Sequence, residues 1–306
     1  MDAIFSFKLP IMLFLQNLRT PFLSKIVELL TSLGEMAIVL GVLVIIYWCV
    51  DKKKGFLVAA PILFSTVAMQ TLKAIFRVPR PFMRYPEQII GERQHTATGY
   101  SFPSGHSTTA SSFYGGLFKA FKEKWIRVIA VSLMIIIPLT RLYLGVHWPM
   151  DVVVGTAIGL FFSLIMASTF LRIYECDSLF FKVCKIVATV TLPVAFALSI
   201  ALDWTEIDYR AVHNLMQNSA IAGGMFLGAY LERKSVNFKV PSAIKSKIKA
   251  LLIGLLMAVP VVVVLMVIPF MHYLFEFAAY TFLGAWISFI YPMIAVKKGW
   301  MDKESK

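Results

Sequence analysis

The chain has 306 residues, of which 58% are hydrophobic and only 15% are charged. Soluble domains carry roughly 25% charged residues, and the apolar residues here come in runs of about twenty, the length that spans a bilayer. A soluble globular protein is therefore excluded, and a multi-span membrane protein is predicted. The formal net charge of +13 does not indicate a nucleic-acid partner, because the lysines and arginines cluster in short loops between the apolar runs.

The N-terminal segment, residues 1–27, differs from the rest of the chain. Residues 4–18 (IFSFKLPIMLFLQNL) are short for a span and are interrupted by Lys8 and Pro10. We expect an amphipathic helix that lies in the membrane interface, with a short tilted span as the alternative. Met1 to Thr20 does not have the pattern of a cleavable signal peptide.

Nine longer apolar segments follow, each of a length that suits a transmembrane helix. They lie at about 28–50, 56–76, 103–121, 125–142, 149–172, 180–202, 211–231, 248–269 and 275–296. The sequence thus predicts an all-α, polytopic membrane helix bundle of about nine transmembrane helices plus the N-terminal interfacial helix. We divide it into residues 1–27, a first bundle at 28–175, and further membrane helices of unknown role at 176–306.

The basic residues predict the orientation. Twenty of the thirty fall in alternate loops and in the tail, which assigns those loops to the cytoplasm. These loops hold Lys52–Lys54, Lys119 to Arg127, Arg172 to Lys185, Arg233 to Lys249 and Lys297 to Lys306. We therefore expect a cytoplasmic C-terminus, a plasma-membrane location, and an extracytoplasmic position for the polar motifs described next.

Three polar motifs interrupt the apolar pattern on this outer face. They are Lys73-x6-Arg80-Pro81, Pro103-Ser104-Gly105-His106 and Arg141-x5-His147-x3-Asp151. Charges near the membrane are costly and usually face a shared cavity. Lysine and arginine neutralise phosphate oxygens, and Ser104 and Gly105 stand at a helix start, where free N–H groups favour an anion. The motifs therefore predict a site for a tetrahedral oxyanion.

The third motif also pairs a histidine with a carboxylate. His147 and Asp151 are four residues apart, with Pro149 between them at a helix start, so the two side chains can meet across the first turn. A carboxylate that holds one imidazole nitrogen makes the other a better base or nucleophile. Taken alone, the pair is equally compatible with a structural hydrogen bond.

Together the three motifs closely resemble the type 2 phosphatidic acid phosphatase (PAP2) superfamily. That family includes lipid phosphate phosphatases, bacterial undecaprenyl-diphosphate phosphatases, glucose-6-phosphatase and, with vanadate in the same pocket, haloperoxidases. The order and spacing match across residues 70–155, and the resemblance extends to about residue 172. Thr140 departs from the serine that usually precedes the arginine, although it retains a hydroxyl.

The resemblance implies a role for each matched residue. His147, oriented by Asp151, would attack phosphorus to give a phosphohistidine, and His106 would protonate the leaving oxygen and later activate water. The ligands of the phosphoryl oxygens would be Lys73, Arg80, Ser104, Gly105 and Arg141. No metal or cofactor is implied, and the sequence has no cluster of carboxylates or cysteines at ligand spacing. The choice of nucleophile comes from the resemblance alone.

Residues outside the motifs receive weaker predictions. Tyr100 and Phe102 are expected at the cavity mouth, and Trp148 is expected to be an interfacial anchor. Asp208 and His213 belong to a polar outer segment. This segment is either a helix–helix contact with an outer cap, or a border of the cavity that helps to choose the substrate or acceptor.

Three functions remain open from the sequence. The first is a phosphatase that acts on a lipid phosphate, whether phosphatidate-like, an isoprenoid diphosphate or a sphingoid phosphate. The second is a phosphotransferase that passes the group to an acceptor other than water. The third is an anion carrier, which the histidine–carboxylate pair disfavours because binding alone does not need an oriented imidazole. The sequence predicts membrane lipids as partners and gives no oligomeric state.

Overall fold

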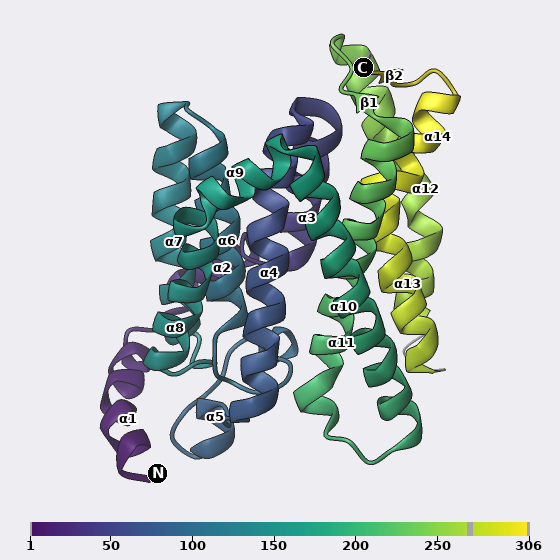
Figure 1. The fold of residues 1–306 in the computed structure, drawn as a ribbon. Coiled ribbons are helices and arrows are strands. Elements are labelled where there is room, and N and C mark those ends of the chain that lie inside the picture. Colours follow the sequence, from purple (N-terminus) through teal and green to yellow (C-terminus); the bar gives the residue numbers. More distant parts are fainter. Residues whose placement is uncertain (1, 268–271, 305–306) are drawn as a thin grey trace. The chain divides into compact units, whose positions relative to one another are not determined.

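The computed structural model describes residues 2–267 and 272–304, and this part of the chain is nearly all helical. The α-helices are α1 (Asp2–Asn17), α2 (Pro21–Ser32), α3 (Met36–Ile45), α4 (Lys52–Phe76), α5 (Pro81–Arg84), α6 (Gly105–Ala120), α7 (Lys124–Tyr143), α8 (Pro149–Leu160), α9 (Ala167–Glu175), α10 (Asp177–Trp204), α11 (Tyr209–Leu231), α12 (Ile244–Val267), α13 (Tyr273–Ala285) and α14 (Tyr291–Lys297) (Figure 1). The predicted all-α class is confirmed.

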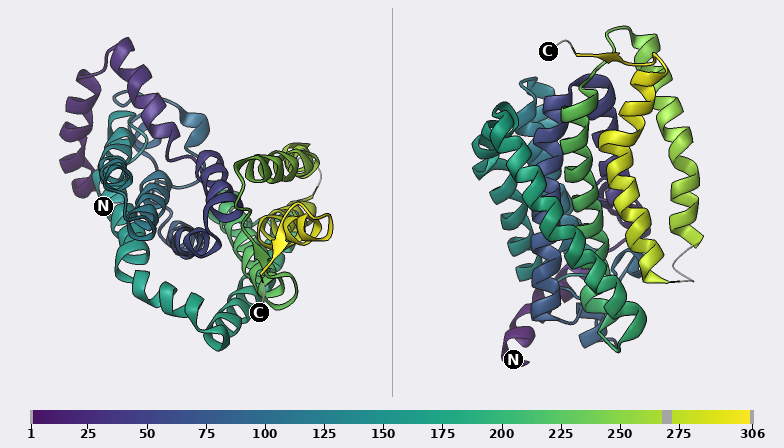
Figure 2. Two further views of the ribbon diagram at one scale, coloured as in Figure 1. Left: turned by 90° about the horizontal axis from the view of Figure 1, so that it is seen from above. Right: turned by 45° about the vertical axis from the view of Figure 1, so that its right-hand side comes forward.

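Short turns of other helix types and one strand pair complete the described part. The turns are η1 (Ile46–Val50), η2 (Gln94–Thr96), η3 (Phe161–Ile165), η4 (Glu232–Val236) and η6 (Trp286–Ile290). Strands β1 (Phe238–Lys239) and β2 (Asp302–Lys303) pair antiparallel. This pair joins the C-terminal tail to the segment between α11 and α12 (Figure 2).

Four helical segments in the described residues are long and apolar enough to cross a membrane. They are Lys52–Arg84, Lys124–Tyr143, Asp177–Trp204 and Tyr273–Lys297. Two bent pairs, Pro21–Ser32 with Met36–Val50 and Pro149–Ile165 with Ala167–Glu175, raise the number to six if each pair is one span. The chain is therefore a multi-pass membrane protein.

The predicted spans 103–121, 211–231 and 248–269 are not among these candidates. The helix in the first, α6, has only 16 residues, many of them serine, threonine or glycine. The second contains His213, Asn214, Gln217 and Asn218 on α11. The third ends outside the described residues. Met1 of the N-terminal segment and the last two residues of the tail also lie outside them.

The chain folds into two compact units. The first comprises Met1–Leu40 and Val58–Ala167, and the second comprises Gly41–Leu57 and Ser168–Lys306. The first unit contains all three polar motifs. The second unit consists mainly of α9 to α14, but it also takes in the end of α3, the turn η1 and the start of α4.

In the first unit α6 packs between α7 and α8 (Figure 1). Ten consecutive α6 residues, Ser107 to Gly116, are buried, so the helix is enclosed on all sides. Two glycines of α8 permit this close approach. A Cβ at Gly155 would lie 2.6 Å from the carbonyl oxygen of Ser104, and one at Gly159 would lie 2.6 Å from the Ser111 Cβ. Small residues on α8 thus bring the start of α6 against the start of α8.

Candidate active site

The three motifs meet at one end of the first unit, where four helices begin or end. Lys73 lies in the last turn of α4 and Arg141 in the last turn of α7, while Ser104 caps the start of α6. Asp151 lies in the first turn of α8. Six of the predicted residues are at most 4% exposed: Lys73, Arg80, Ser104, Arg141, His147 and Asp151. The sequence motifs, which are far apart in the chain, therefore form one buried cluster.

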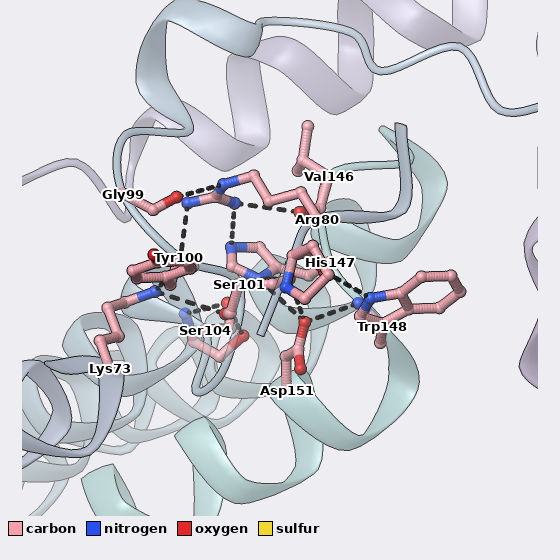
Figure 3. A network of polar contacts seen from close by, with 12 residues as sticks. Lys73, Arg80, Gly99, Tyr100, Ser101, Ser104, Val146, His147, Trp148 and Asp151 are labelled. Carbon is pink, nitrogen blue, oxygen red and sulfur yellow. Dashed lines mark hydrogen bonds and ion pairs between the residues drawn. The ribbon is translucent and has the colours of Figure 1, made fainter. Parts of the chain in front are cut away.

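His147 and Asp151 face each other across the start of α8, as their spacing predicts. The Nδ1 atom of His147 lies 3.4 Å from Oδ2 of Asp151, and the backbone N–H of Trp148 donates to the same oxygen at 2.8 Å. Figure 3 shows the imidazole with the Arg80 guanidinium on one side and Asp151 on the other.

The contact with Arg80 indicates which nitrogen of His147 carries the proton. Nη1 of Arg80 lies 3.1 Å from Nε2 of His147. Because a guanidinium has donors but no acceptor, Nε2 must be the accepting nitrogen of a neutral ring. The proton of His147 therefore resides on Nδ1, which faces Asp151. The lone pair of Nε2 is directed away from the carboxylate, as a nucleophile requires.

The neutral state of this ring also follows from its surroundings. Burial lowers the pKa of His147 well below its ordinary value, and the positive charges of Arg80 and Lys73 lower it further. His147 is thus unprotonated at neutral pH. An imidazolium could not attack phosphorus, whereas the neutral ring can.

Arg80 and Lys73 bind the loop that precedes α6. Arg80 donates to the carbonyl oxygens of Thr98 at 2.7 Å, Gly99 at 3.1 Å and Val146 at 3.0 Å. It also contacts the Tyr100 carbonyl at 3.4 Å. With the His147 contact, all five N–H groups of the guanidinium have acceptors. Lys73 donates to the carbonyls of Tyr100 and Ser101. These two cations therefore fix the loop between the first two motifs.

Arg141 is held differently and keeps unused donors. Its Nη1 donates to Oγ1 of Thr31 on α2 at 2.9 Å. Its Nε and Nη2 atoms are buried and have no hydrogen-bond partner among the described residues, and the same is true of Nε2 of His106. A buried donor without a partner costs about 1–3 kcal/mol, so such groups in a native protein call for an explanation.

The charge balance of the cluster offers an explanation for these unpaired donors. The motifs bring three buried cations together with a single carboxylate, Asp151. The guanidinium groups of Arg141 and Arg80 also act electrostatically on His106. Buried cations in excess of anions are stabilised by an anionic ligand. An anion whose oxygens accept from Nε and Nη2 of Arg141 would satisfy both the charge and the unpaired donors.

The remaining predicted residues have plain structural positions. The hydroxyl of Ser107 donates to Oγ of Ser104 at 2.9 Å, and the Ser104 N–H donates to the Asp151 carbonyl at 2.9 Å. Gly105 opens α6, where first-turn N–H groups lack intrahelical partners. The ring of Phe102 packs on Phe76 with centroids 5.2 Å apart. Tyr100 contributes its carbonyl to Lys73, and Thr140 bonds its own helix at Ile137.

Sequence reasoning missed two residues of this cluster and misinterpreted a third. Ser101 is buried and its hydroxyl donates to Oδ2 of Asp151. Thr31 holds Arg141 from a helix that precedes the motifs. The interpretation of Trp148 as an interfacial anchor is wrong: the residue is 0% exposed and its indole donates to the Pro79 carbonyl at 3.0 Å. No spacing rule marks Ser101 or Thr31, because each makes its contact through a tertiary fold.

His213 and Asp208 lie in the second unit. Nε2 of His213 is 2.8 Å from Oε2 of the buried Glu276 on α13, and Gln217 also donates to Glu276. The His213 ring stacks on Tyr209, with centroids 4.4 Å apart. Asp208 caps α11 by accepting from the Arg210 N–H at 3.0 Å. These contacts fit the interpretation as a helix–helix contact with a cap, and a role beside a substrate stays a prediction.

The described residues contain no group of three or more His, Cys, Asp or Glu side chains arranged to hold a metal ion. Lys73, Arg80 and Arg141 lie around a neutral, oriented imidazole. The anion site that the motifs predict stays a prediction.

Two family models match the chain. One, described as the PAP2 superfamily, matches residues 54–175 and so includes all three motifs. The other, described as a PAP2 superfamily phosphatase transmembrane extension, matches residues 216–303. The two matches cover most of both units.

Curated relatives match shorter stretches. A lipid A 1-phosphatase of Rhizobium johnstonii is 41% identical over 80 residues, which is 26% of this chain and 31% of the relative. A putative undecaprenyl-diphosphatase, YbjG of Escherichia coli, is 29% identical over 141 residues, 45% of this chain and 66% of the relative. The chain thus matches less than two thirds of the length of either relative. The crystal structure of Aquifex aeolicus LpxE has a TM-score of 0.47 and 25% identity, covering 53% of this chain and 95% of that one.

Proposed function

The chain belongs to the PAP2 superfamily, and from this premise we propose that it is a membrane phosphatase that hydrolyses a phosphomonoester or diphosphate of a lipid. One observation carries the proposal. Arg141 keeps two buried nitrogen atoms, Nε and Nη2, that have no partner among the described residues, in a cluster of three cations beside a neutral histidine. A phosphoryl group supplies the missing negative charge and acceptors, and it is the group that such a histidine attacks.

The reaction proceeds in two steps. In the first, Nε2 of His147 attacks phosphorus and the bond from phosphorus to the leaving oxygen breaks, while His106 donates to that oxygen a proton that it takes up when the negative charge of the phosphoryl group offsets the neighbouring cations. In the second, His106 takes a proton from water, the water oxygen attacks phosphorus, and the phosphorus–nitrogen bond breaks. Asp151 holds the Nδ1 proton of His147 throughout and stabilises the positive ring of the phosphohistidine.

The cations hold the phosphoryl oxygens while charge develops on them. Arg141 binds through Nε and Nη2, which have no other partner in the described structure. Arg80 transfers its Nη1 donor from Nε2 of His147 to a phosphoryl oxygen as that nitrogen attacks. Lys73 lies beside the loop that precedes α6. Ser104 and the N–H of Gly105, at the start of α6, complete the set of phosphate ligands.

A lipid substrate suits a site at the ends of membrane helices, and the relatives above are named for lipid phosphates and diphosphates. We place the protein in the plasma membrane with about nine spans, the site on the extracytoplasmic face and the C-terminus in the cytoplasm. The loop charges support this placement. Residues 28–175 form the catalytic bundle and 176–306 the additional helices, after an N-terminal segment that lies in the interface.

The test uses the protein purified in detergent, with EDTA present, and a panel of lipid phosphates that includes phosphatidic acid and an isoprenoid diphosphate. We expect free phosphate from the wild type and none from His147→Ala. His95→Ala is the matched control, because His95 is exposed in the same outer loop. A labelled phosphoryl group that moves to a second lipid would instead identify a transferase. Anion binding without turnover would identify a carrier.

A further inference from the structure

Ser101 connects the three motifs, although it belongs to none of them. It lies in the loop before α6, three residues ahead of Ser104, and it is completely buried. Its backbone N–H donates to the Val78 carbonyl at 2.8 Å, and its own carbonyl accepts from Lys73 at 3.3 Å. The backbone of Ser101 is therefore fixed by the first motif.

The side chain of Ser101 reaches the third motif. Its hydroxyl donates to Oδ2 of Asp151, and Oγ lies 3.4 Å from Nδ1 of His147 (Figure 3). The direct distance from Nδ1 to Oδ2 is also 3.4 Å, which is long for a hydrogen bond to a carboxylate. A hydroxyl can accept one hydrogen bond while it donates another. Ser101 is thus placed to accept a hydrogen bond from the Nδ1–H of His147 while its hydroxyl donates a hydrogen bond to Asp151.

We propose that Ser101 is a positioning residue whose hydroxyl bridges Asp151 and His147 and so fixes the orientation of the imidazole relative to Lys73. This inference rests on the proposed function, in which Nε2 of His147 is the nucleophile. Oγ of Ser101 and Oδ2 of Asp151 lie at the same distance from Nδ1, 3.4 Å, so the ring N–H is shared between the hydroxyl and the carboxylate. The two contacts together define the ring angle, and with it the direction in which Nε2 points at the phosphoryl group.

Ser101→Ala removes the bridge and leaves the backbone contacts in place. The expected loss in kcat for phosphate release from phosphatidic acid micelles is about tenfold to a hundredfold, as for a hydrogen bond to a charged group. KM should change by less than about twofold, because the hydroxyl acts on the nucleophile and not on the bound lipid. Ser65→Ala is the control, because Ser65 is equally buried in the same unit but bonds only the Ile62 carbonyl of its own helix.

A double-mutant cycle separates positioning from a purely structural role. If Ser101 acts through the Asp151–His147 pair, Ser101→Ala should lower kcat by less than about threefold when Asp151→Asn is already present. An equal loss in both backgrounds, or an unchanged kcat in Ser101→Ala alone, would overturn the inference. If Ser101→Ala does not purify as a single species, Ser101→Cys replaces it, because a thiol keeps the volume but donates weakly.

Orthovanadate provides a readout that does not need turnover. It adopts the geometry of a phosphoryl group under attack, and its affinity is measured from the rise in Tm. Ser101→Ala should bind vanadate about tenfold more weakly than the wild type, and Ser65→Ala should match the wild type. Absence of phosphate release by the wild type together with this vanadate difference would reject the proposed function and retain the positioning role. Equal vanadate affinity in wild type and Ser101→Ala would reject the positioning role.

Discussion

At the scale of single residues, the proposed nucleophile lies against a cation. Nε2 of His147 accepts from Arg80, whose other donors are all used by backbone carbonyls. Of the two arginines, Arg141 is the one with nitrogen atoms that have no partner among the described residues. In the proposed mechanism an incoming phosphoryl group would therefore meet Arg141 first, and the Arg80 contact would have to be exchanged before attack. The three cations are not equivalent, although the sequence motifs present them as one set.

Arg141→Lys tests the importance of the guanidinium shape. A lysine carries the same charge but cannot present two donors in a fixed plane while a third contacts Thr31. We expect kcat/KM to fall about a hundredfold, as when a donor to the developing charge is removed. Arg77→Lys, at an exposed position between Lys73 and Arg80 that the motif leaves unspecified, should retain wild-type kcat/KM. A fully active Arg141→Lys would mean that charge alone is required there.

The lowered pKa of His147 predicts how stability depends on pH. Below its ordinary pKa of about 6.5, the unfolded chain binds a proton at His147 that the folded chain does not. The contribution of the neutral ring is therefore fully present above that pH and is lost as the pH falls toward the folded pKa, at up to about 1.4 kcal/mol per pH unit. Tm in detergent should drop between pH 7 and pH 5 more steeply for the wild type than for His147→Asn. Parallel slopes for the two proteins would contradict this assignment.

At the scale of elements, the site depends on a helix that lies outside the matched family region. α2 precedes residues 54–175, yet Thr31 holds Arg141 and Ser32 accepts from Arg93 at 2.8 Å. Arg93 also pairs with Glu35 at 2.7 Å. The N-terminal part of the chain thus braces both the third motif and the outer loop.

Thr31→Val keeps the shape of the side chain and removes its acceptor. Nη1 of Arg141 then loses its described partner, and the guanidinium is free to rotate away from the site. We expect phosphate release to fall by about tenfold. Thr71→Val, on the exposed face of α4 where Thr71 bonds only Val67 of its own helix, serves as the control. Equal activities of the two variants would show that α2 does not contribute to the site.

The contact between α6 and α8 gives a second prediction at this scale. Gly155→Ala would place a methyl 2.6 Å from the Ser104 carbonyl, which pushes the start of α6 away from the start of α8. Such overpacking costs about 1–3 kcal/mol, so Tm and activity should both fall. Gly41→Ala should have little effect, because nothing lies within 4 Å of a Cβ there. Wild-type activity in Gly155→Ala would show that the spacing tolerates change.

The elements also show what could be predicted from the sequence. The helices, and the positions of Lys73, Ser104, Arg141 and Asp151 at their ends, followed from apolar run length and motif spacing. The count of nine spans stays a prediction, because α6, for example, is short and polar although it is enclosed by its neighbours. Contacts such as Ser101 to Asp151 and Thr31 to Arg141 join residues 50 and 110 positions apart. No local pattern encodes them.

At the scale of the whole molecule, the orientation in the membrane can be tested with natural and introduced thiols. Cys176 is exposed, whereas Cys49 and Cys184 are buried. In the proposed topology Cys176 faces the cytoplasm, so a membrane-impermeant maleimide should label it only after the cells are permeabilised. Glu87→Cys, at an exposed position of the outer loop, should be labelled on intact cells. Labelling of the wild type on intact cells would reverse the topology.

The second unit joins segments that lie far apart in the chain, and this has a consequence for biosynthesis. Trp48 donates its indole N–H to the Ile287 carbonyl, which lies 239 residues later in the chain, and Lys52 pairs with Glu232. At translation rates of about 5–20 residues per second, Trp48 would leave the ribosome roughly 10–50 s before Ile287. For that interval the indole N–H of Trp48 lacks the partner that it has in the folded chain, although Phe56, near the start of α4, can already pack on Tyr174. The order of synthesis therefore makes the last helices a condition for completing the contacts of the segment that leads into α4.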